Sequence, residues 1–130
     1  MGGDGFRELK VWQRAKDMAV LIYRITDGGG IARDFGLKDQ IRRAAVSVPS
    51  NIAEGDERDT NKDSVRFLFI AKGSLAEVIT QTIIANEVGY INDVDRSHIE
   101  QECEVLGKML GSLIKARSAP PQKAGMTPDP

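Results

Sequence analysis

The sequence predicts an all-α protein folded as an antiparallel, up-and-down four-helix bundle. In four successive segments, apolar residues recur three and four positions apart, and no segment shows the strict alternation of a strand. Short connections separate the segments, which favours antiparallel neighbours. A chain of 130 residues with 41% hydrophobic content can bury one core. We therefore expect one domain, with a flexible N-terminus over residues 1–7, the bundle over 8–117 and a disordered tail over 118–130.

The first two helices are expected over residues 8–26 and from residue 35 to between residues 55 and 58. The glycines at positions 28–30 end the first helix and form a connector, and Asp34 can cap the second helix. Each helix has one apolar stripe. The stripe residues are Val11, Ala15, Met18, Ile22 and Ile25 in the first helix, and Leu37, Ile41, Ala44, Val48 and Ile52 in the second.

The third helix is expected from Thr60 to about residue 88, and the fourth from residue 92 or 93 to residue 117. Thr60 and Asp63 form a near match to a capping box, and Gly89 is suited to a C-terminal cap. Acidic residues early in the fourth helix and basic residues late in it complement the helix dipole. Its apolar face comprises Ile99, Cys103, Leu106, Leu110 and Leu113.

The third helix is apolar nearly all round, more than a lone four-helix bundle needs. One stripe suits the core, a second lies about a quarter-turn away and a third lies nearly opposite. This surplus predicts a subunit interface, unless flanking side chains of the first and fourth helices cover it. The three stripes are Val65, Leu68, Leu75, Ile79 and Ile83; then Phe67, Ala71, Val78 and Ala85; then Ile70, Ile84 and Val88.

Residues 47–55 place a proline and several small polar or acidic groups inside the second helix. In a helix interior, Pro49 removes a backbone donor at a cost of roughly 3 kcal/mol, so tertiary structure or function should offset it. A polar stripe flanks the core here. It indicates a polar network or subunit contact, with a ligand or nucleic-acid site and catalysis as alternatives. The stripe consists of Arg43, Ser47, Asn51, Glu54 and Arg58.

Two sets of candidate site residues follow from these patterns. The residues expected in an interface or polar network are Arg43, Ser47, Pro49, Asn51, Glu54, Phe67, Ile70, Gly73, Ser74 and Glu77. The residues that could contact nucleic acid are Arg33, Lys38, Arg42 and Arg43. Asp39 dilutes this basic patch and is placed to pair with Arg43, and the net charge of −1 gives no global signal for nucleic acid.

The sequence predicts no catalytic residues, no cofactor and no metal site. His98 is the only histidine, and Cys103 follows the apolar rhythm of its helix without an activating neighbour. A single cysteine suits a reducing compartment, and no apolar run approaches the ~20 residues of a membrane span. We expect a cytoplasmic protein with no membrane partner and no small-molecule ligand.

Several motifs, in order and spacing, resemble a known bacterial family of four-helix bundles, first noticed as open reading frames in intervening sequences of 23S ribosomal RNA genes. The resemblance covers about residues 6–117. Its carriers are Leu9-Lys10-Val11-Trp12-Gln13 with Ala15, Phe35-Gly36-Leu37, the run from Gln40 to Ser47, the motif from Pro49 to Gly55, Arg66-Phe67-Leu68, and the run from Ala71 to Glu77.

This resemblance implies a left-handed bundle that assembles into a homopentameric ring, in a family without established enzymatic activity. A related accessory protein of diversity-generating retroelements is strongly basic and binds nucleic acid and a reverse transcriptase. Nucleic-acid binding by a ring of repeated basic patches is therefore the alternative function. The chain departs from the family pattern at residues 28–31, where an aromatic-proline turn is common, and at Asp56, where an aromatic residue often follows Glu-Gly.

Overall fold

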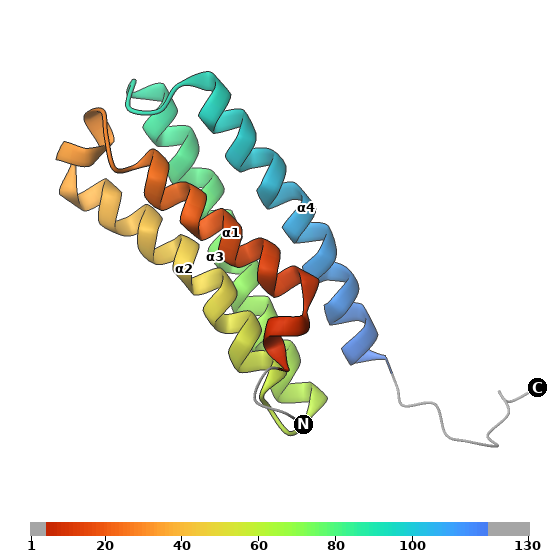
Figure 1. Ribbon diagram of the computed structural model, residues 1–130. Coiled ribbons are helices and arrows are strands. Elements are labelled where there is room, and N and C mark those ends of the chain that lie inside the picture. The colour runs from red at the N-terminus through yellow and green to blue at the C-terminus, as the bar shows by residue number, and fades with distance from the viewer. Residues whose placement is uncertain (1–4, 120–130) are drawn as a thin grey trace, which may run out of the picture.

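The computed structural model describes residues 5–119 and forms a four-helix bundle (Figure 1). Neighbouring helices run antiparallel, and α2 packs most extensively against α3. No strand occurs in this part of the chain. The helices are α1 (Lys10–Ile25), α2 (Phe35–Asp56), α3 (Asn61–Glu87) and α4 (Asp93–Ser118), with short 3-10 helices η1 (Phe6–Glu8) and η2 (Gly30–Arg33).

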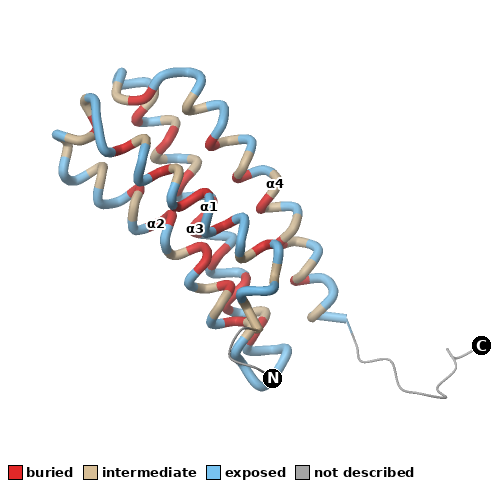
Figure 2. The backbone as a smooth tube through the Cα atoms, in the orientation of Figure 1, coloured by how far each residue is buried: buried red, intermediate tan, exposed pale blue. Residues whose placement is uncertain are grey.

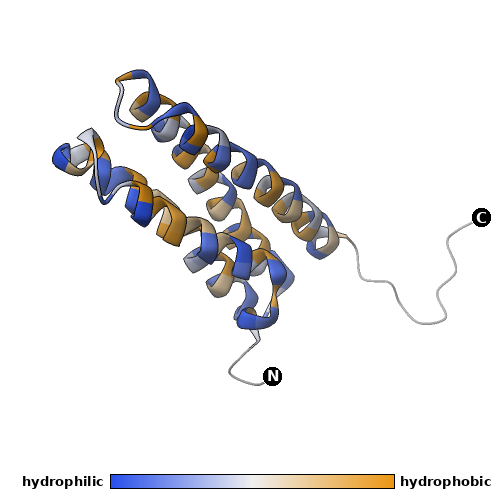
Figure 3. Cartoon of the chain, turned by 45° about the horizontal axis from the view of Figure 1, so that its top comes forward, coloured by the Kyte–Doolittle hydropathy of each residue, from blue (hydrophilic) through white to orange (hydrophobic). Residues whose placement is uncertain are grey.

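The predicted fold class is therefore confirmed. The expected flexible N-terminus and disordered tail fall largely on residues 1–4 and 120–130, which lie outside the described residues. Buried residues line the inner sides of all four helices (Figure 2), and the hydropathy pattern follows them (Figure 3). The largest fully buried side chains include Met18, Ile22, Ile41, Ile52, Leu68, Leu106 and Leu110.

Three helix starts follow the capping chemistry read from the sequence. The side chain of Asp34 accepts a hydrogen bond from the Leu37 amide at 3.0 Å, and Thr60 accepts one from the Asp63 amide at 3.2 Å. Asn92 accepts one from the Asp95 amide at 2.7 Å. Gly89 follows the end of α3 with a φ of 85°, as expected of a C-terminal glycine.

The connection after α1 holds a feature that the sequence analysis missed. Residues 30–33 form η2, which buries Ile31 in a small cluster with Ala85 and Ile91 at one end of the bundle. Gly30 is required there, because an added Cβ would lie 2.5 Å from the ring of Tyr90. The connector thus ends in one closely packed glycine, Gly30, at the start of η2.

The core face of α3 differs from the expected one. Leu68 and Leu75 are buried as predicted, but Val65, Ile79 and Ile83 are only partly buried. The second stripe is buried completely, because α3 turns that side toward α2. Part of the supposed surplus therefore belongs to the monomer core. The second-stripe residues that the single chain buries are Phe67, Ala71, Val78 and Ala85.

At the end of α2, two features hold α2, α3 and α4 together. A Cβ on Gly55 would lie 3.1 Å from the Ser64 carbonyl oxygen and 3.3 Å from the Phe67 Cβ, so glycine permits this close approach. Arg117 of α4 donates to Ser64 Oγ at 2.6 Å and to the Asp56 carboxylate at 3.0 Å. One side chain thereby joins three helices.

By length and composition, α3 meets the usual criterion for a membrane-spanning helix. No uninterrupted apolar run of about 20 residues was expected from the sequence, whereas this criterion averages hydropathy over a window and allows two charged residues. Core helices of soluble proteins pass the same test, and α3 packs between α2 and α4. The composition of α3 alone is therefore weak evidence for a membrane.

Candidate subunit interface

A polar network joins α2 to α3 at the motif that begins with Ser47. The hydroxyls of Ser47 and Ser74 lie 2.8 Å apart. The Asn51 side-chain amide donates to Ser47 Oγ at 2.9 Å and to the Ser47 carbonyl at 2.8 Å. Ser74 is buried, so its hydroxyl depends on this partner. The structure thus joins three residues of the set expected in an interface or polar network.

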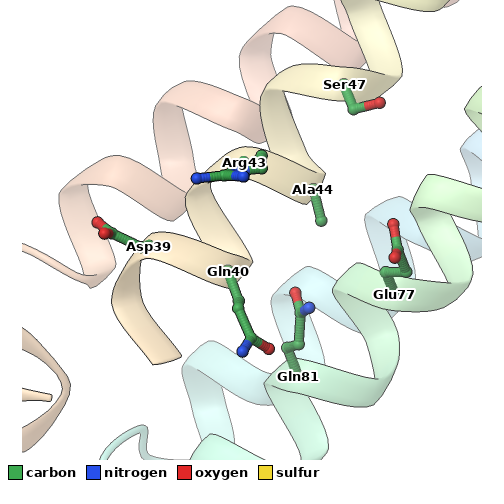
Figure 4. A pocket seen from close by; sticks show the side chains of 7 residues that line it. All are labelled: Asp39, Gln40, Arg43, Ala44, Ser47, Glu77 and Gln81. Carbon is green, nitrogen blue, oxygen red and sulfur yellow. The ribbon is translucent and has the colours of Figure 1, made fainter. Parts of the chain in front are cut away.

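A groove of about 400 Å³ runs beside this network between α2 and α3 (Figure 4). Gln40 from α2 and Gln81 from α3 extend into the space between the two helices, as Figure 4 shows. The side-chain oxygen of Gln81 is buried and has no hydrogen-bond partner in the described chain. The groove is lined by Asp39, Gln40, Arg43, Ala44, Ser47, Glu77 and Gln81.

Three of the charged residues on this groove lack a partner within residues 5–119. No hydrogen bond or ion pair joins the side chains of Asp39, Arg43 or Glu77 to another described residue. The expected pairing of Asp39 with Arg43 is therefore not formed. These groups are free to interact with something outside the single chain.

Apolar side chains are exposed on the outer surface of α3 and include the predicted third stripe. Ile70, Ile84 and Val88 are 42%, 47% and 57% exposed, and Phe69 on the adjoining side is 55% exposed. On a helical wheel, Ile70 and Ile84 lie in one row with Glu77, which lines the groove. The polar groove and the exposed apolar row therefore form one surface, which we call the α2–α3 face.

The other residues expected at an interface lie in different surroundings. Phe67 is buried in the core, beneath the guanidinium groups of Arg58 and Arg66 at 4.4 and 4.6 Å from its ring centre. Gly73 is exposed on α3. Pro49 is buried on the opposite flank of α2, facing α1. Glu54 is exposed and forms only a long ion pair of 3.5 Å with Arg58.

The four basic residues that could contact nucleic acid differ in whether their side chains already have hydrogen-bond partners. Arg42 donates to Thr26 Oγ1 at 2.8 Å and to the Tyr23 carbonyl at 3.2 Å, with Tyr23 stacked beside it. Lys38 donates to the Ala32 carbonyl at 3.3 Å. Arg33 and Arg43 are exposed. Two of the four cations therefore have structural partners at the end of α1 and in η2.

Cys103, the only cysteine of the chain, has a thiol that is buried in the core. Cys103 is buried with its sulfur 3.5 Å from the sulfur of Met18, as its apolar rhythm predicts. Burial, with smaller contributions from Glu100 and Glu102, raises the pKa of the Cys103 thiol to about 12. At neutral pH the reactive thiolate is almost absent. His98 is exposed, and no group of three or more potential metal ligands occurs in the described chain.

Sequence reasoning did not find Gln40, Gln81 or Arg117. The two glutamines gave no signal because exposed glutamine on a helix is common. Arg117 was read as a charge that complements the helix dipole. Its partner Asp56 lies 61 residues away along the chain, a separation at which no local pattern operates.

Together, the fold and these contacts define an up-and-down four-helix bundle protein with a hydrogen-bonded network and an open polar groove between α2 and α3. The chain belongs to the 23S rRNA-intervening sequence protein family, whose model matches residues 7–112. The family resemblance seen in the sequence is thereby confirmed.

Comparison with solved structures supports the same architecture. The chain is similar to a crystal structure of a protein with unknown function from the S23 ribosomal protein family of Bacteroides thetaiotaomicron VPI-5482. The TM-score is 0.74 at 24% sequence identity, over 81% of this chain and 98% of that chain. No curated protein matches the sequence. The comparison confirms the fold and leaves the function to be inferred from the surface.

Proposed function

We propose that the protein is a non-enzymatic subunit of a homo-oligomeric ring, pentameric by its resemblance to the family, and that the α2–α3 face forms a subunit contact. The observation that carries this proposal is the exposure of Ile70, Ile84 and Val88 beside the polar groove. Interfaces combine exposed apolar side chains with polar groups, as this face does.

The groove adds a second line of support. Asp39, Arg43 and Glu77 lack partners within the described chain, and the Gln81 oxygen is buried without a donor. The three charged side chains are exposed, so a second subunit can reach them and supply partners of opposite charge. The apolar row and the unpaired polar groups thus both favour a protein partner on this face.

Light scattering coupled to gel filtration tests the proposal. The full chain should elute as a discrete oligomer at micromolar concentration, and its mass should give the number of subunits. A strict monomer at high micromolar concentration would exclude the proposed function. The variant Ile84→Arg should shift the mass toward that of a monomer, whereas Val94→Arg on α4, at a side chain 78% exposed, should leave the mass unchanged.

Nucleic-acid binding is a second candidate, supported by the exposed Arg33. Arg43 is also exposed in the single chain, but it lines the groove that the proposed subunit contact covers. In a ring, Arg33 would repeat around the assembly, so that weak phosphate contacts add through avidity. Retention on immobilised structured RNA should then fall steeply with salt. The variant Arg33→Gln should lower retention at a given salt concentration, and absence of retention at low salt would rule this candidate out.

A further inference from the structure

The flank of α2 that faces α1 carries a second exposed groove, of about 590 Å³. Its surface is mainly apolar, because Val20, Tyr23 and Val46 are each about 40% exposed and Pro49 lies beneath them. Three basic residues and one acidic residue line its rim: Lys16, Arg24, Arg42 and Asp27. We call this the α1–α2 groove.

The α1–α2 groove is complementary in charge to the α2–α3 face. Lys16 is paired with Asp17 and Arg42 with Thr26, but no hydrogen bond or ion pair holds the Arg24 side chain in the part of the chain described. Across the molecule, Glu77 is equally unpaired. A guanidinium group supplies several donors to a carboxylate. Arg24 can therefore supply the cation that Glu77 lacks.

From these surfaces we infer that the subunits join head to tail, with the α1–α2 groove of one copy receiving the α2–α3 face of the next. This inference rests on the proposed self-association. In it, Arg24 pairs with Glu77, and exposed apolar side chains on the two faces cover one another. Pro49 contributes to the floor of the receiving groove, which gives the unusual proline a place in the assembly.

Both grooves involve α2, and their positions on this helix allow a head-to-tail contact to form a closed ring. One groove uses residues 42–49 of α2 and the other uses residues 39–47, so the two lie at the same level along the bundle. At about 100° per residue, the mean directions of the two sets lie roughly 125° apart around α2. Two different faces at the same level allow a head-to-tail contact without axial shift, and such a contact forms a closed ring.

Charge exchange between Arg24 and Glu77 tests this arrangement on the full chain. Arg24→Glu and Glu77→Arg should each weaken association at least about 100-fold, because each places like charges together at the contact. The double variant Arg24→Glu with Glu77→Arg should recover most of the wild-type mass in light scattering. Mixing the two single variants should restore association in part. Contacts between unlike variants pair opposite charges, whereas a ring with an odd number of subunits keeps at least one contact between like variants.

Matched controls are available on α4, where Lys108 and Glu104 are exposed and pair only with each other. Lys108→Glu and Glu104→Arg should leave the mass of the assembly unchanged. Circular dichroism on every variant establishes that the bundle is intact. If wild type is a monomer, the proposed function itself fails. If wild type is an oligomer but the single variants keep its mass, or the double variant is not rescued, the head-to-tail contact is wrong while self-association stands.

Discussion

Two polar clusters on α2 differ in how completely the single chain satisfies them. At the end of α2, Arg117 bonds both Asp56 and Ser64, and these three side chains lie beside the close approach at Gly55. In the middle, the groove leaves Glu77 unpaired and the Gln81 oxygen without a donor. The first cluster therefore serves the fold of the monomer, whereas the second retains the capacity to bind a partner.

The largest expected effect of breaking the end cluster comes from Gly55→Val. The added side chain must push against the Ser64 carbonyl and the Phe67 Cβ, and overpacking of this kind typically costs about 1–3 kcal/mol. Urea unfolding at fixed chain concentration measures the change. Gly107→Val is the control, because a Cβ at Gly107 would meet nothing within 4 Å, and stability there should change by less than about 0.5 kcal/mol. Equal losses at both sites would contradict the packing argument.

Removing the Arg117 guanidinium should have the next largest effect. Arg117→Met leaves the Asp56 carboxylate, whose side chain is 12% exposed, without its cation, at an expected cost of about 1–3 kcal/mol. Adding Asp56→Asn to Arg117→Met should recover part of the loss, because the unpaired charge is then gone. A double-mutant cycle by urea unfolding measures this coupling, and strictly additive effects would show that the pair does not contribute.

A smaller effect is expected from Ser47→Ala in the α2–α3 network. The Ser74 hydroxyl and the Asn51 amide each lose a partner, and we expect a loss of about 1 kcal/mol. Ser47→Ala combined with Ser74→Ala should cost less than the two single changes together, since no buried hydroxyl then remains unpaired. Additive losses in thermal unfolding would contradict this network.

The smallest effect on the fold should come from Glu77→Gln in the groove. Because no described residue pairs with Glu77, the unfolding free energy of the dissociated chain should change by less than about 0.5 kcal/mol. When the protein is diluted, the oligomer of this variant should nevertheless dissociate at a higher concentration than the wild-type oligomer. A clear loss of stability in the dissociated chain would mean that this groove serves the monomer as the end cluster does.

The helix pattern was readable from the sequence because its determinants are local. Asp34, Thr60 and Asn92 begin their helices through bonds to amides three residues away, and such spacing is visible in the chain itself. The side of α3 that faces the core was harder to predict from the sequence. Its wheel carries several apolar stripes, and which of them faces the core depends on how α2 and α4 approach it.

The candidate site was predictable in part. Ser47 and Asn51 were expected in one polar stripe of α2, and a hydrogen bond joins them. The bond from Ser47 to Ser74 of α3 was not predicted. The partners of Arg42 were not predictable, because Thr26 and Tyr23 come beside it only in the folded bundle. Contacts between helices depend on the tertiary fold, so they cannot be predicted from the periodicity of a single helix.

The shielded thiol has a consequence for the chemistry of the assembly. Cys103 lies in the core beside Met18, and burial raises its pKa to about 12. Disulfide formation needs a thiolate that can reach its partner. Folded subunits brought together at high local concentration would therefore not become covalently cross-linked by oxidants, and their association would remain reversible in oxidising and reducing conditions alike.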